Sequence, residues 1–398
     1  MEGNTAWMLI STALVLFMVP GLALFYGGMV RSKNVLNMLN MNTYCLGIVP
    51  LVWVLVAFSL SSSGSGDGLE AVIGNLDFLG LQDVKGTNAL IAVAFSMTFA
   101  AITPALISGA VADRMKFSAW AIFVPVWCLL VFTPVFYWVY VGWHHSKLDP
   151  AAIDFAGGTA IHINAGVAAL ALVMVLGKRA GWPDQAMPPH NLPFVMLGAG
   201  ILWFGWFGFN GGSALAADGV AAQAVLNTFV AGAAGMVAWL AIEWKRDGHA
   251  TTLGGASGVV AGLVAITPAA GFVGGLAPII FGFVASVACY FAIQLKTKYG
   301  YDDSLDVVGI HMVGGIVGGV LLGFFADASI GGVDGAFFGD GGLVLSQIIA
   351  IVSVMIYSFV VTYGIAKVLD NLMGLRVGSD KELTGLDQTQ HAETAYVD

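Results

Sequence analysis

Residues 154–166 read DFAGGTAIHINAG, and residues 303–315 read DSLDVVGIHMVGG. In each stretch a histidine follows an isoleucine, an aspartate precedes the histidine by eight positions, and a glycine follows it by four. The matching residues are Asp154, His162 and Gly166 in the first stretch and Asp303, His311 and Gly315 in the second. This likeness suggests an internal repeat, and the apolar sequence around the two histidines decides the fold class.

Eleven apolar runs of about 20 residues fill most of the 398-residue chain, and about 20 residues are needed to cross a hydrocarbon core roughly 30 Å thick. Hydrophobic residues make up 58% of the chain and charged residues 10%, which excludes a water-soluble enzyme, a disordered chain and a disulfide scaffold. The runs predict an all-α polytopic membrane protein. Their expected bounds are 6–29, 36–60, 88–112, 117–139, 155–177, 192–212, 221–243, 253–268, 272–295, 307–325 and 343–369.

The two histidine stretches lie in the fifth and tenth runs, five spans apart. Because five is an odd number of spans, the two stretches run in opposite directions across the membrane. Transporters with inverted repeats have this arrangement, with a binding site at the repeat interface. We therefore expect helices 1–5 and 6–10 to form an inverted repeat, followed by a long helix 11. On this division residues 1–370 are the transmembrane domain and residues 371–398 are a polar tail, whose composition is compatible with disorder.

The charged loop residues indicate how the chain is oriented. Thirteen of the 15 Lys and Arg residues fall on one side of the predicted spans, and Lys85 and Lys147 fall on the other. The positive-inside rule then places the N-terminus outside the cell membrane and the C-terminus in the cytoplasm. Eleven acidic residues share the outer side with the two lysines, so the net charge of −9 lies on that face. Such a field attracts small cations, although each acid by itself is typical of a solvated loop.

Of the seven histidines, His162 and His311 are the two within apolar runs. A lone histidine at membrane depth is usually a hydrogen bond between helices, but two at repeat-related positions favour a site. Neutral imidazoles offer one donor and one acceptor each, whereas a bare ion would lose its hydration at great cost. The pair therefore favours a small hydrogen-bonding solute, or an ion that releases its proton on the way.

No cofactor is expected. The three cysteines lie singly in apolar runs and form no CxxC pair, so they resemble small core residues. A membrane enzyme with two histidines as haem or metal ligands is an alternative, but no HExxH, CxxCH or carboxylate-rich cluster supports it. The negative net charge also argues against a nucleic-acid partner.

Several further motifs follow in order along the chain. They are ALFYGG at 23–28, KNV at 33–35, TFA at 98–100, GAVADR at 109–114, WFGFN at 206–210, GLRV at 374–377 and GLD at 385–387. Together with residues 154–166, they resemble the ammonium transporters of the Amt/Mep/Rh family, in the bacterial Amt form, nearly from end to end. The resemblance implies a channel or transporter rather than an enzyme.

The resemblance also implies roles for individual residues. His162 and His311 would be twin pore histidines joined by a hydrogen bond, and Phe99 and Phe209 would be a stacked aromatic gate. Ser213 would accept a hydrogen bond from ammonium in an outer vestibule, where an aromatic ring adds a cation–π contact of about 0.5–2 kcal/mol. Ammonium would then be conducted as ammonia, with or without a separately carried proton.

The vestibule aromatic departs from the family pattern, which commonly has Trp near the end of helix 4. The simplest register places Tyr140 at that position, and Trp143 is its rival. Both could instead be aromatic anchors at the membrane interface. Asp154 also has two interpretations: it supports the N-terminus of helix 5, or it takes part in binding or deprotonating ammonium below the vestibule.

The implied partners are other copies of the chain in a homotrimer, membrane lipid, and a PII-type nitrogen regulatory protein that blocks the cytoplasmic openings. The resemblance further implies that the tail packs on the cytoplasmic face and couples the subunits. An ammonium sensor that signals through its tail is a second hypothesis, although no motif of a kinase or cyclase follows the last span.

Overall fold

The computed structural model describes residues 2–396, and within that range the protein is helical, with one isolated β-bridge between Met115 and Arg376. Ten helical segments are long and apolar enough to cross a membrane, and α11 (Thr252–Ile266) is a shorter apolar helix. The predicted all-α polytopic fold with eleven helices is confirmed. In α11, which falls in the short eighth run, nearly every side chain is buried by other helices, so a short span suffices there.

The spans of the first half are helical segments, several of them built from shorter pieces. They are α1 (Glu2–Met29); η1 (Ser32–Asn34), α2 (Val35–Val52), η2 (Trp53–Ala57) and α3 (Phe58–Ser62); α4 (Thr87–Val111); α5 (Phe117–Trp127), η5 (Cys128–Phe132), α6 (Thr133–Tyr140) and α7 (Trp143–Ser146); and η6 (Gly158–Ile163) with α8 (Asn164–Leu176). The loop between α3 and α4 carries two single turns, η3 (Gly68–Ala71) and η4 (Leu79–Leu81).

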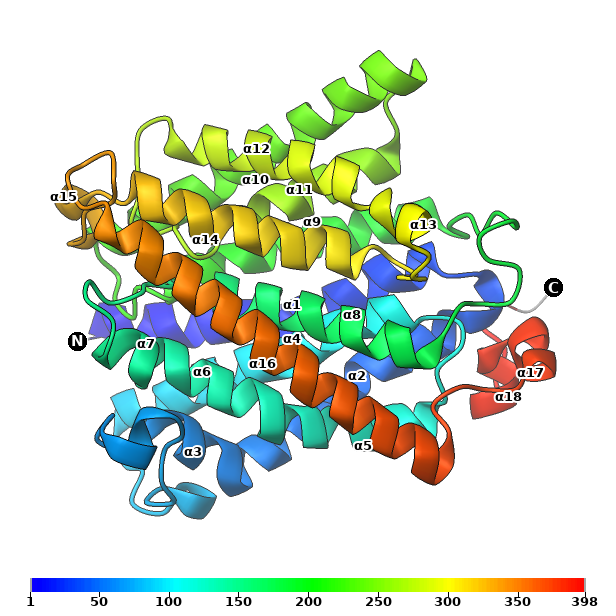
Figure 1. The fold of residues 1–398 in the computed structure, drawn as a ribbon, viewed down its shortest axis with the longest axis horizontal. Coiled ribbons are helices and arrows are strands. Elements are labelled where there is room, and N and C mark those ends of the chain that lie inside the picture. Colours follow the sequence, from blue (N-terminus) through cyan, green and yellow to red (C-terminus); the bar gives the residue numbers. More distant parts are fainter. Residues whose placement is uncertain (1, 397–398) are drawn as a thin grey trace.

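The second half repeats this order. Its spans are α9 (Leu192–Gly212); α10 (Gly219–Asp247); α11; α12 (Ala277–Ala292) with α13 (Leu295–Tyr299); and η7 (Val308–Met312) with α14 (Val313–Phe325). After the short α15 (Ala328–Gly331), α16 (Gly342–Met373) is the last span. Figure 1 shows α16 crossing the bundle obliquely, and it packs against α8, α14 and α5.

The two halves meet through their first and fifth helices. The first helices, α1 and α9, share the most extensive helix contact in the molecule. In the fifth helices, a Cβ added to Gly166 would stand 2.6 Å from Cβ of Met312, next to His311. A Cβ added to Gly315 would stand 2.8 Å from a side-chain carbon of Ile163, next to His162. The shared glycines therefore let each half approach the other's histidine segment.

The fifth span begins later than predicted. Residues 155–157 were expected to be helical, but the helix starts at Gly158 because Gly157 has a φ of +104°, a left-handed conformation that ends regular helix geometry. Asp154 and its neighbours thus form a loop that leads into the helix. This loop places the aspartate at the helix N-terminus.

The bundle has two distinct ends (Figure 1). The N-terminus, α7 and α15 lie at one end, which we call the vestibule end, and α13, α17 (Ser379–Thr384) and α18 (Leu386–His391) lie at the opposite end, the tail end. Residues 371–396 of the polar tail include the helices α17 and α18 and contact the start of α2, an arrangement that composition alone did not predict. Asp387 accepts hydrogen bonds from the backbone N–H groups of Leu36 (3.1 Å) and Asn37 (2.8 Å) at the start of α2.

Candidate functional site

The two intramembrane histidines are in direct contact. Nδ1 of His311 lies 3.2 Å from Nδ1 of His162, and the two rings are nearly parallel, with centroids 5.3 Å apart. Their exposed fractions are 2% for His162 and 4% for His311. One Nδ1 donates and the other accepts, an arrangement that two neutral rings can make with one shared hydrogen. The structure thus brings together two residues that are 149 positions apart in the sequence.

Each histidine lies on a π-helical turn, His162 in η6 and His311 in η7. π-Turns are rare and occur often at functional sites, because the widened turn changes the direction of its side chains. The two repeated sequence stretches thus share the same local structure.

An aspartate caps each of these turns. The carboxylate of Asp154 accepts four backbone N–H bonds, from Gly157 (2.8 Å), Gly158 (2.7 Å), Thr159 (2.8 Å) and Ala160 (3.1 Å). Burial raises the pKa of Asp154, and these four donors act in the opposite direction. A carboxylate at a helix N-terminus also interacts favourably with the helix dipole. Asp154 therefore fixes the start of the segment that carries His162.

Asp303 caps the second turn with fewer bonds. It accepts N–H bonds from Val307 (3.1 Å) and Val308 (2.7 Å). Burial, and then the nearby charge of Asp306, raise the pKa of Asp303 to about 6. A capping aspartate is thus present at this helix as well, but its carboxylate has a second acid beside it.

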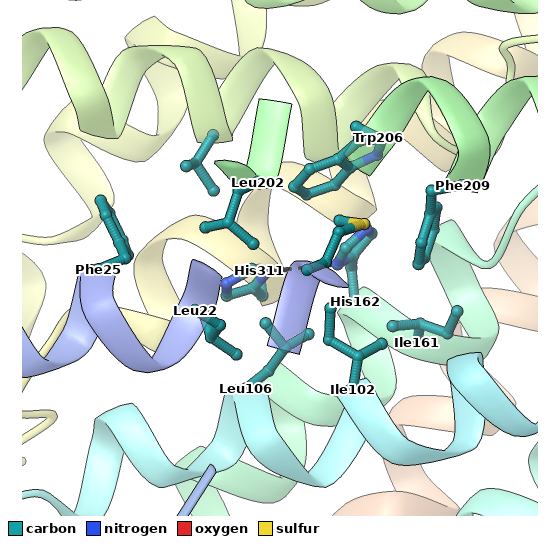
Figure 2. Close-up of a pocket in the computed structure, with 12 residues that line it drawn as sticks. Leu22, Phe25, Ile102, Leu106, Ile161, His162, Leu202, Trp206, Phe209 and His311 are labelled. Atoms are coloured by element: carbon teal, nitrogen blue, oxygen red, sulfur yellow. Dashed lines mark hydrogen bonds between the residues drawn. The ribbon is translucent and has the colours of Figure 1, made fainter. Parts of the chain in front are cut away.

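A narrow passage surrounds the histidine pair. Figure 2 shows His162 and His311 in the middle of an apolar lining, with Phe209 on one side and Leu22 and Phe25 on the other. The cavity here measures about 10 Å³, which is room for about one water-sized molecule. Apart from the histidines and the indole N–H of Trp206, its lining side chains are apolar. A hydrated ion could not pass without losing its water.

Phe99 and Phe209 stack against each other, with ring centroids 4.3 Å apart and an angle of 25° between the rings. Phe99 lines a larger cavity at the vestibule end, and Phe209 lines the narrow passage. The stacked pair therefore separates the two cavities. This is the geometry that the resemblance implies for a gate, and opening would require at least one ring to move.

The larger cavity, which we call the vestibule, has a volume of about 480 Å³. Tyr140, Asp154 and Ser213 all line it, so the structure gathers the three residues proposed for ammonium binding around one space. The hydroxyl of Ser213 donates to the carbonyl of Phe209 at 2.8 Å, which leaves its oxygen free to accept. Trp143 is not among the lining residues and instead packs against Trp138 and His144. The register that selects Tyr140 thus fits the geometry.

A polar cavity of about 270 Å³ lies at the tail end, beside a charge network that the sequence analysis did not predict. Arg179 binds the carboxylate of Asp302 through Nε (2.9 Å) and a terminal nitrogen (2.8 Å). Burial lowers the pKa of Arg114 to about 10. Burial also opposes the charged form of Asp302, but the bonds and charge of Arg179 and the charge of Arg114 outweigh it, so the pKa of Asp302 lies below its usual value.

Trp206 is a further site residue that was singled out only as part of a motif. Its ring stacks on His162 with centroids 5.5 Å apart, and its indole N–H donates to the hydroxyl of Thr267 at 2.9 Å. The bond to Thr267 fixes the ring plane, and the ring in turn limits the rotation of His162. Only the WFGFN motif at 206–210 pointed to this residue.

The histidine pair alone has too few ligands for a typical metal centre. Zinc sites in proteins usually have three or four protein ligands, and the pair supplies two. Within residues 2–396, no group of three or more His, Cys, Asp or Glu side chains is placed to hold a metal ion.

Comparisons with known proteins agree with this geometry. The sequence model of the Ammonium Transporter Family matches residues 6–396. An ammonium transporter of Mycobacterium tuberculosis is 49% identical over 434 residues, which cover 99% of this chain and 90% of that protein. The crystal structure of Saccharomyces cerevisiae Mep2 has a TM-score of 0.89 at 32% identity and covers 96% of this chain and 88% of its own. A structure described as a sensor Amt protein has a TM-score of 0.91 at 25% identity, covering 98% of each chain.

The match extends over nearly the whole chain, and the relatives are named as transporters rather than as enzymes. The chain is a multi-span membrane protein that belongs to the ammonium transporter family.

Proposed function

We propose that this protein recruits ammonium in the vestibule and conducts ammonia past His162 and His311, with or without a separately carried proton. The observation that carries the proposal is the histidine pair, buried in an apolar passage directly behind a stacked aromatic pair. A charged ion would be strongly disfavoured there, because no charged group lines the passage to offset the lost hydration. A neutral, water-sized solute is compatible with it.

Three features of the vestibule support recruitment of a cation. Ser213 offers a free acceptor oxygen, Tyr140 offers an aromatic ring, and Asp154 contributes negative charge when ionised. An aromatic ring attracts a cation by about 0.5–2 kcal/mol, which holds ammonium briefly without trapping it. Phe99 and Phe209 would then admit the solute to the passage.

The histidine pair supplies the polar contacts along the passage. Nε2 of His162 has no hydrogen-bond partner among residues 2–396, so it can bond to a passing ammonia while Nδ1 keeps its bond to His311. Neutral imidazoles can also change which nitrogen carries the hydrogen. This provides a route for a proton that leaves ammonium at the vestibule.

Flux measurements in proteoliposomes test the proposal. We expect the double variant His162→Ala, His311→Ala to lose ammonium-over-potassium selectivity, or to lose flux at least about tenfold, a change of about 1.4 kcal/mol in the barrier. His249→Ala is the matched control, because His249 is exposed in the loop before α11. Unchanged rate and selectivity in the double variant would contradict the twin-histidine mechanism.

Currents on a solid-supported membrane would define the transported species. A sustained charge displacement after an ammonium jump excludes purely neutral conduction, whereas flux without current excludes net ammonium transport. The same recording on the histidine variants would show whether the pair carries the proton.

We infer that the protein works in the cell membrane as a homotrimer, with its vestibule end outside and its tail end in the cytoplasm. The distribution of Lys and Arg supports this orientation, and family membership supports the trimer. A PII-type regulatory protein would then meet the tail end. Native mass spectrometry tests the trimer, and labelling of single cysteines introduced at Ser329 and His249 tests the orientation.

A sensor is the second candidate function, favoured by the structural likeness to a protein described as a sensor Amt protein. A sensor would bind ammonium in the vestibule and change the contacts of its tail. Saturable ammonium binding with negligible flux in proteoliposomes would favour it over transport.

A further inference from the structure

Asp154 borders a second, smaller cavity besides the vestibule. This cavity measures about 10 Å³, and its lining includes His144, Thr159 and Ala350. Room for about one water requires roughly 10–15 Å³ by the same measure. His144 belongs to α7, and Ala350 belongs to α16. The cavity therefore lies where α7, the loop at Asp154 and α16 come together.

His144, which lines this small cavity, has a buried ring nitrogen without a hydrogen-bond partner among the described residues. The residue is 1% exposed, and its Nδ1 is buried with no hydrogen-bond partner among residues 2–396. Buried polar atoms almost always have a partner, in the protein or in an ordered water. An orphaned ring nitrogen beside a water-sized cavity therefore calls for a ligand.

The hydrogen bond of Nε2 shows which nitrogen of the neutral His144 ring carries the hydrogen. Nε2 lies 2.9 Å from the hydroxyl of Ser353, and that hydroxyl donates its own hydrogen to the carbonyl of Ala350, also at 2.9 Å. Because a serine hydroxyl has one hydrogen, Ser353 must accept from His144. Nε2 therefore carries the hydrogen of the neutral ring, and Nδ1 is a bare acceptor that needs a donor.

We propose that this cavity binds one ordered water molecule, which donates one hydrogen to Nδ1 of His144 and the other to the carboxylate of Asp154. A water has two hydrogens to donate, and both named partners are acceptors. Buried waters typically make two to four hydrogen bonds, and Thr159 lines the same cavity and supplies a further polar group.

The water would make His144 a positioning residue for Asp154. Through Ser353 the ring is attached to α16, and through the water it reaches the carboxylate that caps η6, which carries His162. The same carboxylate lines the vestibule. The chain of contacts from Ser353 to Asp154 thus holds the vestibule carboxylate against the long final helix.

An experimental structure of the intact protein tests the water itself, and this test is independent of transport. At a resolution where other buried waters are visible, we expect one water within hydrogen-bond distance of Nδ1 of His144 and of Asp154. No density at that position would overturn the proposal. The result stands even if the proposed transport function fails.

Two substitutions test the hydrogen bonds of the two ring nitrogens of His144 separately. The amide oxygen of His144→Asn can replace Nδ1 as the acceptor, whereas the amide nitrogen of His144→Gln reaches toward the position of Nε2. His145→Gln is the matched control, because His145 is exposed one residue further along. Thermal unfolding in detergent shows whether each variant folds.

The functional readout rests on the proposed binding of ammonium in the vestibule. We expect His144→Gln to raise KM for ammonium by about three- to tenfold with little change in maximal rate, because a water-mediated bond contributes nearly as much as a direct one. His144→Asn should stay within about twofold of wild type. The reverse order, with Gln tolerated and Asn impaired, would show that only the bond to Ser353 matters and would overturn the positioning role.

Discussion

The two histidine segments have the same local structure in different surroundings. Each has a capping aspartate, a π-turn with a histidine and a glycine where the other half packs. The first segment opens on an aromatic vestibule, where Asp154 is the carboxylate that lines the cavity. The second lies in a charge network, where Asp303 has Asp306, Lys296 and the Arg179–Asp302 pair nearby.

The comparison indicates that the spacing from aspartate to histidine determines the local backbone geometry. The groups packed around each aspartate determine its charge environment. Asp154 accepts four N–H bonds and Asp303 accepts two. At the vestibule end, four N–H donors thus hold one carboxylate beside the vestibule cavity. The tail end spreads its charge over several groups, which suits an opening to water.

The largest expected effect compares the two caps. Asp154→Ala leaves four buried N–H groups without their acceptor, and Asp303→Ala leaves two. At about 1–1.5 kcal/mol for each lost bond, Asp154→Ala should lower the free energy of unfolding about twice as much as Asp303→Ala. Chemical unfolding in detergent micelles measures both. Equal losses of unfolding free energy would mean that the number of N–H bonds accepted by the capping aspartate does not distinguish the two segments.

The next effect tests the charge network at the tail end. Arg179→Met removes the partner of Asp302, whose side chain is 0% exposed, and breaking a buried pair costs about 3–5 kcal/mol. The double variant Arg179→Met, Asp302→Asn also removes the leftover charge, so it should regain more than half of the loss. Thermal unfolding of the two variants side by side provides the measurement. A double variant as unstable as the single one would argue against a buried charge as the cause.

A smaller effect tests the reciprocal glycines. The Cβ of Gly166→Ala would meet the backbone N and Cα of Met312, the latter at 2.7 Å, whereas the nearest backbone atom to the Cβ of Gly315→Ala is the carbonyl oxygen of Gly158 at 3.0 Å. Backbone yields less readily than a side chain, and the backbone contacts of Gly166→Ala are closer, so this variant should be the more destabilising, within about 1–3 kcal/mol. Gly364→Ala in α16 is the control, since an added Cβ there meets no atom within 4 Å. A more harmful Gly315→Ala would contradict the asymmetry.

The smallest effect concerns the vestibule aromatic. Tyr140→Trp replaces a weaker cation–π partner by the strongest, which should lower KM for ammonium by about two- to fivefold, or roughly 0.5–1 kcal/mol. Trp143→Phe serves as the control, because Trp143 does not line the vestibule. Concentration series of ammonium flux in proteoliposomes provide the values. A shift in the control and none in Tyr140→Trp would reassign the aromatic to Trp143.

Much of this structure could be predicted from the sequence. Hydropathy gave the eleven helices, because membrane thickness dictates span length. The eight-residue spacing from Asp154 to His162, and from Asp303 to His311, indicated a repeat with a capped helix start. The histidine pair came from its position in two apolar runs, whereas the gate and vestibule residues came from the resemblance, and the roles of all of them remain predictions.

Other features depend on contacts that no local pattern encodes. The orientation of Trp206, which stacks on His162, depends on a bond to Thr267, 61 positions away. The order of the tail could not be predicted from composition, because it depends on contacts such as the two hydrogen bonds that Asp387 accepts from α2. The acceptor role of His144 follows from Ser353, 209 positions away.

The cap that Asp387 provides for α2 has a consequence for biosynthesis. Asp387 lies 351 positions after Leu36, whose backbone N–H it accepts. A ribosome makes α2 long before it reaches Asp387, so the second span enters the membrane with its N-terminal N–H groups without this acceptor. Completion of that helix end therefore reports that the chain has been translated through Asp387, and a protein truncated before Asp387 would carry an incomplete α2 on its surface.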